Sequence, residues 1–121
     1  MDAYAAYRKE LGGLGEDLAA VFLERSGMRV VDRNWRCPAG EIDIVARDGP
    51  VLVVAEVKTR TRLRHGHPTE AIGPGKRERL RRLGRAWAHA RRVPGRPLRI
   101  DGLGVLLTGG RVYVSHERGL T

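Results

Sequence analysis

Four charged residues interrupt a stretch that is otherwise apolar and typical of β-strands. Glu41, Asp43, Glu56 and Lys58 lie within GEIDIVARDGPVLVVAEVKTR at residues 40–60. A charge inside a strand is costly unless it pairs, accepts hydrogen bonds or binds a metal. The Asp48-Gly49 pair is a strong hairpin-turn signal, which predicts one strand over GEIDIVA and another over VLVVAEVKTR.

The register of this hairpin predicts that the four charges share one face. If Asp48 and Gly49 are the central turn residues, Arg47 faces Pro50 and Glu41 opposes Glu56. Side chains alternate between faces along a strand, so the second face is predicted to be apolar throughout. That face would carry Ile42, Ile44, Ala46, Val51, Val53, Ala55 and Val57.

In this register Asp43 and Glu56 are diagonal neighbours, about 7–8 Å apart at the backbone, and their carboxylates can converge. Converging acids repel each other, and one proton or one divalent cation relieves the repulsion. Oxygen ligands favour Mg²⁺ or Mn²⁺ over zinc. The alternative is that these acids form ordinary ion pairs at the edge of a sheet. Lys58 favours the metal site, because a compact ammonium can orient a water there and 20 of the 23 basic residues are arginine.

The composition predicts one folded domain spanning residues 1–121. The chain has 41% apolar and 31% charged residues, which is typical of globular proteins. No apolar run approaches the roughly 18 residues that cross a bilayer, and the first residues lack the apolar stretch of a secretion signal. Cys37 is the only cysteine, which excludes an internal disulfide. We therefore expect a cytoplasmic protein without a membrane partner.

The remaining periodicities place the charged hairpin within an α/β fold. Helical spacing predicts a helix over residues 3–25, although Gly12, Gly13 and Gly15 suggest that its firm part begins near Leu14. A basic helix with an apolar stripe is predicted from residue 74 or 76 to residue 92. Further strands are predicted over residues 28–36, 98–107 and 111–115, and a loop over residues 61–75. The order α-β-β-β-α-β-β predicts a mixed central β-sheet flanked by helices.

The net charge of +9 is unevenly distributed along the chain. Residues 1–58 carry −2 and residues 59–121 carry +11. A basic surface of this density attracts polyanions, of which nucleic acids are the commonest, although the charge could serve solubility alone. Phosphate contacts set affinity without reading sequence, so we expect recognition of shape or branching. The predicted phosphate contacts are Arg60, Arg62, Arg64, Lys76, Arg77 and Arg79.

Two levels of resemblance follow from these motifs. Asp43, twelve further residues and then Glu56-Val57-Lys58 resemble the PD-(D/E)xK signature of nucleases with the restriction-endonuclease-like fold, with Ile42 in place of the proline. Longer strings resemble the YraN-like uncharacterised bacterial family, which is itself similar to archaeal Holliday-junction resolvases. These strings are GLGEDLAAVFL, RNWRCPAGEIDIVARDG, VVAEVKTR, HGHPTEAI and GKRERL.

The resemblance implies a role for each charged residue. Asp43 and Glu56 would be metal ligands, and Lys58 would position the attacking water. Glu16 would supplement the metal site or face solvent, and Glu41 would be a base beside the site or a surface charge. The implied function is a Mg²⁺- or Mn²⁺-dependent endonuclease that hydrolyses phosphodiester bonds of structured or branched DNA, with a homodimer as the expected assembly. A non-catalytic nucleic-acid-binding module that retains the fold stays open as the alternative, as does an adaptor whose basic helix binds a protein.

Overall fold

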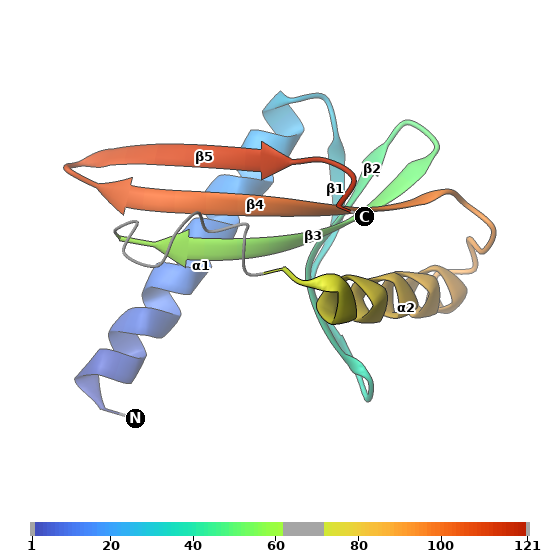
Figure 1. The fold of residues 1–121 in the computed structure, drawn as a ribbon, viewed down its shortest axis with the longest axis horizontal. Helices are drawn as coiled ribbons and strands as arrows, with labels where there is room; N and C mark the ends of the chain where they lie inside the picture. The colour runs from blue at the N-terminus through green and yellow to red at the C-terminus, as the bar shows by residue number, and fades with distance from the viewer. Residues whose placement is uncertain (1, 62–71, 121) are drawn as a thin grey trace.

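The computed structural model describes residues 2–61 and 72–120, and two helices and five strands lie in that part of the chain (Figure 1). The predicted order α-β-β-β-α-β-β and the mixed α/β class are confirmed. The elements are α1 (Ala3–Arg25), β1 (Arg29–Cys37), β2 (Gly40–Asp48), β3 (Val51–Arg60), α2 (Pro74–Ala90), β4 (Leu98–Thr108) and β5 (Arg111–Glu117). Most of the predicted loop, with Arg62 and Arg64, lies outside the described residues.

The five strands form one mixed sheet in the order β1-β2-β3-β4-β5. β3 and β4 are parallel and the other neighbours are antiparallel. Parallel neighbours need a long crossover connection, and α2 lies within the segment that supplies it. Neither helix of the described residues has the length and apolar character that a bilayer-crossing segment needs.

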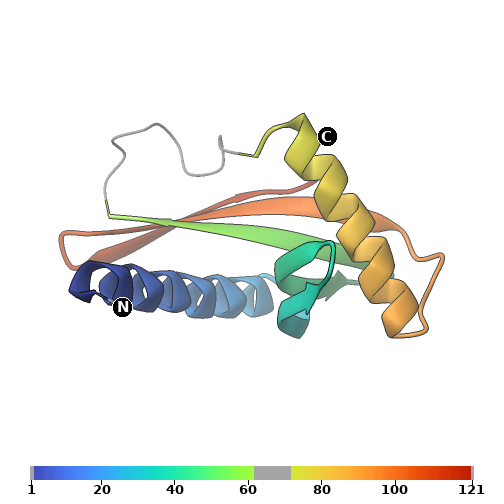
Figure 2. The same ribbon diagram turned by 90° about the horizontal axis from the view of Figure 1, so that it is seen from below.

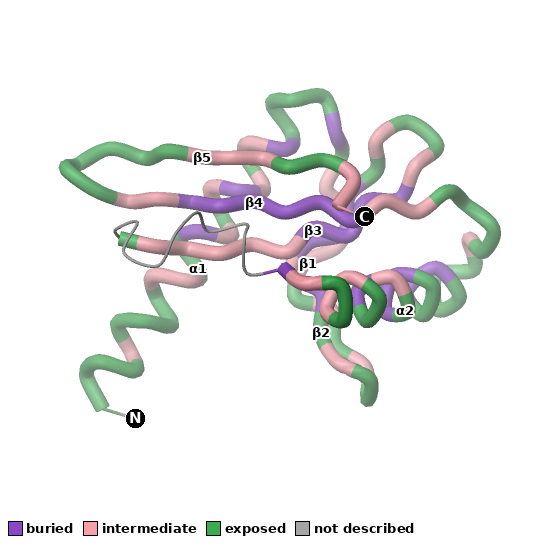
Figure 3. Tube along the Cα trace, viewed as in Figure 1, coloured by how far each residue is buried: buried purple, intermediate pink, exposed green. Residues whose placement is uncertain are grey.

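The helices cover opposite faces of the sheet. On one face Ala19 and Leu23 of α1 pack with Val53 of β3. On the other face Leu83 of α2 packs with Val54 of the same strand. Figure 2 shows α1 along one side of the sheet, and α2 crossing near the end that is distant from the start of α1. Burial is therefore deepest in the middle strands, as the purple stretches of β3 and β4 show (Figure 3).

The prediction that the firm part of α1 begins near Leu14 was wrong, because the helix is continuous from Ala3. Asp2 caps it, since its carboxylate accepts the Ala5 N–H at 2.7 Å. Gly15 is buried where the helix meets β3, and a Cβ there would collide with the Thr59 side chain. The glycine that weakens helix propensity is thus the residue that allows the close approach.

The predicted hairpin register was shifted by two residues. Asp48 pairs with Val51, and Val45 pairs with Val54, so the two-residue turn is Gly49-Pro50. Gly49 has φ of 59°, the region that a type II′ turn requires at its first central position, and the following proline fits the second. A shift of two residues preserves the face of each side chain, and the predicted faces are observed from Ile44 to Ala55.

Ile42 does not lie on the face predicted for it. It packs with Val45 in the cluster on the α2 side, whereas Ile44 packs on the α1 side. Asn34 of β1, in the position opposite Asp43, has φ of 52°, in the left-handed region that asparagine tolerates. The strict alternation of side chains is thus interrupted between Ile42 and Ile44.

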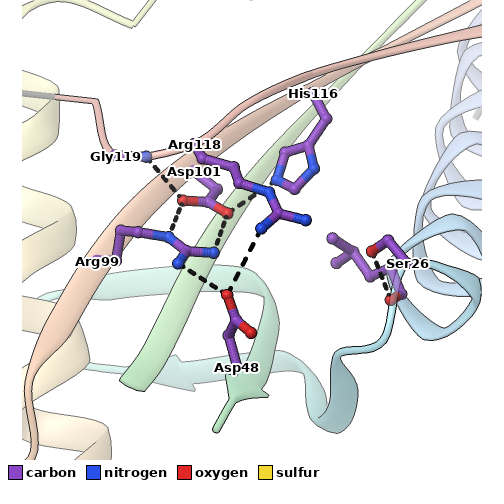
Figure 4. A network of polar contacts seen from close by, with 8 residues as sticks. Ser26, Asp48, Arg99, Asp101, His116, Arg118 and Gly119 are labelled. Atoms are coloured by element: carbon purple, nitrogen blue, oxygen red, sulfur yellow. Dashed lines mark hydrogen bonds and ion pairs between the residues drawn. The ribbon is translucent and has the colours of Figure 1, made fainter. Parts of the chain in front are cut away.

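A buried ionic network ties the C-terminal residues to β4 (Figure 4). Asp101 is 0% exposed and accepts hydrogen bonds from Arg99 Nε at 2.9 Å and from Gly119 N at 3.0 Å. His116 Nε2 lies 2.8 Å from the same carboxylate, and Arg99 also donates to Asp48 at 2.9 Å. Burial alone would raise the pKa of Asp101, but these partners outweigh it and lower the pKa to about 2.

Candidate active site where β2 and β3 diverge

The charged residues gather where β2 separates from β3. The two strands pair from Asp48–Val51 to Ile44–Ala55. Beyond that point β3 continues beside β4, whereas β2 continues beside β1 towards the tip of their hairpin (Figure 1). The Asp43 carboxylate accepts the Val57 N–H at 2.8 Å. A side chain therefore satisfies the strand edge that β2 has left, and this bond holds Asp43 against β3.

An open pocket of about 500 Å³ lies in this fork. β2 and β3 contribute acidic groups to it, and the first turns of α2 contribute basic ones. Its lining includes Glu41, Asp43 and Glu56 together with Arg36, Lys76 and Arg79. The structure thus brings three of the four predicted acidic site residues into one pocket.

Asp43 is the most perturbed acid of this pocket. Burial raises its pKa, and the neighbouring Glu56 carboxylate raises it further, to about 7. The hydrogen bond from Val57 acts in the opposite direction but does not offset them. Ionising Asp43 is therefore costly near neutral pH, and this carboxyl group can accept either a proton or a cation.

Glu56 has two lysine neighbours. Its side chain is 12% exposed, and Lys76 Nζ lies 2.7 Å from its Oε1 atom. Lys58 Nζ lies 4.0 Å from the same oxygen. The pKa of Lys58 is lowered, first by burial and then by the positive charge of Lys76. The two lysines therefore share a single carboxylate.

Glu41 and Glu16 occupy different surroundings. Glu41 is 44% exposed and pairs with Arg36 Nε at 2.9 Å, an arrangement typical of a surface ion pair at the pocket rim. Glu16 lines a neighbouring hollow of about 230 Å³ together with Lys58 and Arg60. Burial raises the pKa of Glu16 despite the opposing charge of Arg33. Its buried Oε1 atom accepts no hydrogen bond from the described residues.

The predicted three-carboxylate metal site is not assembled as such. Among residues 2–61 and 72–120, no three carboxylate, imidazole or thiol groups come together in an ion-binding cluster. Asp43 and Glu56 nevertheless fit Mg²⁺, which commonly takes one or two protein carboxylates and completes its shell with waters and phosphate oxygens. The raised pKa of Asp43 beside the Glu56 carboxylate supports this fit.

The basic residues predicted to contact phosphates are divided among several places. Lys76 and Arg79 line the acidic pocket, and Arg60 lines the hollow beside Glu16. Arg77 lines neither of these cavities, and Arg62 and Arg64 lie outside the described residues.

Sequence reasoning missed two ion pairs, Lys76 with Glu56 and Arg36 with Glu41. The first pair joins residues that are 20 positions apart and lie on different elements, and no sequence pattern links them. The second pair lies directly across the β1–β2 ladder, so it depends on the register of these two strands.

Comparison with known proteins supplies a family. The model of the uncharacterised protein family UPF0102 matches residues 15–105. The chain belongs to the UPF0102 family. A UPF0102 protein of Renibacterium salmoninarum is 56% identical over 112 residues, which cover 92% of this chain and 95% of that protein. A UPF0102 protein of Arthrobacter sp. (strain FB24) is 57% identical over 113 residues, which cover 91% of this chain and 94% of that protein. A UPF0102 protein of Streptomyces coelicolor is 53% identical over 117 residues, which cover 93% of this chain and 89% of that protein.

The membership confirms the family resemblance predicted from the sequence motifs. The segment that matches UPF0102 contains Glu16, Asp43, Glu56, Lys58 and Lys76, so the whole candidate site lies within the family's shared region. The family is described as uncharacterised, and its function is therefore argued from the chemistry of this site.

Proposed function

We propose that this UPF0102 protein is a metal-dependent nuclease with a restriction-endonuclease-like fold that hydrolyses phosphodiester bonds of structured or branched DNA. One observation carries the proposal: Asp43 and Glu56 line the same pocket, where burial and their mutual repulsion raise the pKa of Asp43 to about 7. A buried carboxyl group whose pKa is strongly raised beside a second acid is expected where a cation is to be bound, and perturbed pKa values cluster at functional sites.

The arrangement of the sheet supports the proposed fold. The acids stand on the hairpin of β2 and β3, and the parallel β3–β4 pair with α2 between them in sequence provides a rigid platform below the pocket. Asp43 is fixed by its bond to Val57, and Glu56 and Lys58 follow on the same face of β3. Sites that are built on strands hold their groups more accurately than sites on loops.

The chemistry follows from these groups. A Mg²⁺ or Mn²⁺ ion bound by Asp43 and Glu56 would neutralise phosphate charge and lower the pKa of a coordinated water. Lys58, 4.0 Å from Glu56 Oε1, is placed to orient the attacking water and to stabilise the charge that develops on the phosphate oxygens. The partial burial of this lysine strengthens that electrostatic effect, because nearby water screens it less.

The nucleic-acid partner is inferred from the basic rim. Lys76, Arg79 and Arg36 stand at the pocket that holds the acids, so phosphates beside the cleaved bond have cationic contacts. Arg82 and Arg85 are exposed farther along α2 and extend the positive surface. Such contacts carry no sequence information, which favours recognition of DNA shape.

A second candidate function rests on a specific observation. The ion pair of Lys76 with Glu56 at 2.7 Å already neutralises one of the two acids without any metal. That arrangement favours a nucleic-acid-binding module that keeps the fold and has no turnover.

Cleavage assays distinguish the two functions. Duplex, single-stranded and four-way-junction DNA are incubated with Mg²⁺ or Mn²⁺ and with wild type, Asp43→Asn, Lys58→Met or Glu78→Gln. We expect each of the first two variants to lose at least about a hundredfold in cleavage rate, a typical cost of removing one group that stabilises the transition state. Glu78 is an exposed residue of α2 paired with Arg81, and its variant should cut like wild type.

Two results would contradict the nuclease. Salt-sensitive binding of DNA without cleavage of any substrate would favour the binding module, and cutting by both site variants at the wild-type rate would remove Asp43 and Lys58 from the mechanism. Binding that does not weaken with salt would exclude a nucleic-acid partner altogether, since phosphate contacts release counterions.

The expected homodimer belongs to the same proposal. Tyr4, Tyr7, Leu14 and Val21 of α1 are large apolar side chains that are exposed in the isolated chain. Exposed apolar groups that recur along one helix support an interface. Sedimentation of the protein at micromolar concentration tests this, and a monomeric mass would contradict it.

A further inference from the structure

Lys76 joins the start of α2 to the acidic pocket. The helix begins at Pro74, and Lys76 in its first turn extends to β3, where its Nζ atom lies 2.7 Å from Glu56 Oε1. The Lys76 side chain is 25% exposed and Glu56 is 12% exposed, so this contact is sheltered from water on the Glu56 side. A sheltered, charge-assisted hydrogen bond of this length is a strong one.

This bond occupies an oxygen that a divalent cation would use. Lys58 lies 4.0 Å from the same Oε1 atom, so Glu56 has cationic neighbours, whereas Asp43 accepts one hydrogen bond from the described residues, the Val57 N–H. An ammonium hydrogen-bonded to a carboxylate oxygen and a metal ion coordinated by that oxygen compete for it. Coordination of the cation by this Oε1 atom therefore displaces Lys76 from it.

The open pocket has room for the ammonium group of Lys76 after its release from Glu56. Lys76 and Arg79, one turn apart on α2, both line the pocket, which is open to solvent and wide enough for a phosphate. The Lys76 ammonium, freed from Glu56, stands beside the position of a phosphate that approaches the two carboxylates. The long flexible stem of lysine allows this movement without a shift of the helix.

We propose that Lys76 is an exchangeable counter-ion, which neutralises Glu56 in the metal-free protein and is released by a divalent cation to contact the phosphate of the bound nucleic acid. The exchange makes each ligand favour the other, because metal binding frees a phosphate contact. This inference rests on the proposed nuclease function and adds to it a coupling between its two ligands.

The first test measures the affinity for Mn²⁺ by titration calorimetry in wild type, Lys76→Met and Arg79→Met. Methionine keeps the unbranched stem and the helix propensity. Loss of the competing ammonium should tighten Mn²⁺ binding roughly tenfold in Lys76→Met, the equivalent of one strong hydrogen bond to a charged group. Arg79 lines the same pocket, has no ion pair within the described part of the chain, and controls for loss of a positive charge. Its variant should stay within about twofold of wild type.

The second test measures the affinity for labelled duplex DNA by fluorescence anisotropy, with a chelator or with Ca²⁺ as the cation. Lys76→Met should bind like wild type without a cation and about fivefold more weakly with Ca²⁺, since only the released lysine contacts phosphate. Arg79→Met should weaken binding by the same factor in both conditions. Circular dichroism of each variant establishes that it is folded.

The outcomes separate the two proposals. If wild type binds Mn²⁺ but Lys76→Met binds it with the same affinity, the exchange is wrong and the nuclease proposal stands. Equal weakening of DNA binding by Lys76→Met in both conditions also overturns the exchange, because Lys76 would then be an ordinary phosphate contact. If wild type binds no divalent cation, the metal-dependent function fails and the exchange fails with it.

Discussion

Replacing Asp43 by asparagine should stabilise the metal-free protein. The pKa of Asp43 rises from the usual 3.8 to about 7, mainly through burial and the Glu56 carboxylate. One pKa unit corresponds to 1.36 kcal/mol, so ionising this group in the folded state costs at most about 4 kcal/mol. The pocket is open to solvent, which screens this charge, so we expect a gain of roughly 2–3 kcal/mol. Asparagine keeps an oxygen for the Val57 N–H and removes only the charge.

The dependence on pH follows from the direction of the shift. A raised carboxyl pKa means that the folded state holds its proton more tightly than the unfolded state. The stability of wild type should therefore fall as the pH rises from about 4 to about 7, and should then level off as far as Asp43 is concerned. The advantage of Asp43→Asn should grow over the same interval and be largest above about pH 7.

Urea unfolding of both proteins in the presence of a chelator, at about pH 5 and about pH 8, measures this difference. Glu78→Gln is the matched control, because it removes an exposed carboxylate and should change the free energy of unfolding by less than about 0.5 kcal/mol at both pH values. Mn²⁺ should stabilise wild type and not Asp43→Asn, as expected when a ligand binds only the folded state. An asparagine variant that is no more stable than wild type at about pH 8 would refute the reasoning that the Asp43 charge is held at a cost.

Two further predictions concern the parts of the fold that support the site. Asp101→Asn should destabilise the protein by roughly 2–4 kcal/mol at neutral pH, because the amide turns a donor towards Arg99 and His116. The pKa of Asp101 is lowered to about 2, so this carboxylate stabilises the fold above about pH 4 and loses its effect as the pH falls towards 2. Urea unfolding should therefore show that the loss of unfolding free energy in Asp101→Asn is smaller at acidic than at neutral pH. A loss that does not depend on pH would contradict this. Gly15→Ala should cost about 1–3 kcal/mol by collision with Thr59. Gly13→Ala, where nothing lies within 4 Å of the added Cβ, should gain up to about 1 kcal/mol; thermal melts that rank the two glycine variants in the opposite order would refute the close packing of α1 on β3.

The element order was predictable from the sequence because each element carries a local signal. Helical spacing of apolar residues marked α2, and alternation with short turns marked β2 and β3. Boundaries agreed within a few residues. The register of the β2–β3 hairpin was not predictable to the residue, because both Asp48-Gly49 and Gly49-Pro50 are acceptable two-residue turns. Local sequence favours neither turn, and the packing of the two strands decides between them.

The long-range geometry was beyond local reasoning for a different reason. Gly15 reads as a helix-weakening residue until Thr59, which is 44 positions later, is known to lie against it. Ile42 lies on the α2 side of the sheet although Ile44 lies on the α1 side, and the alternation of residues along β2 does not predict this break. Both are tertiary effects that override local propensity.

The acidic residues of the candidate site were predictable from the sequence, but the cationic partner of Glu56 was not. A charge in an apolar strand needs compensation, which identified Asp43 and Glu56 from the sequence alone. The partner of Glu56 comes from α2, twenty residues later and on another element, and no periodicity links Lys76 to β3. The separation of Glu16 from the other acids likewise depends on how α1 lies across the sheet.

Two aspartates of the same sheet have opposite effects on stability: ionised Asp101 stabilises the fold, whereas ionised Asp43 destabilises it. Asp101 is fully buried, yet its pKa is about 2, because arginine, histidine and a backbone N–H all converge on it. Asp43 is less buried, yet its pKa is about 7, because it has one N–H partner among the described residues and faces another carboxylate. Burial alone therefore cannot explain the difference; the partners do. A sequence selected only for stability would give Asp43 a cationic partner, as Arg99 is for Asp101. Alternatively, it would carry asparagine at position 43. Retaining the uncompensated acid is understandable if a ligand supplies the missing positive charge, which is why the cation, rather than the basic surface alone, is central to the proposed function.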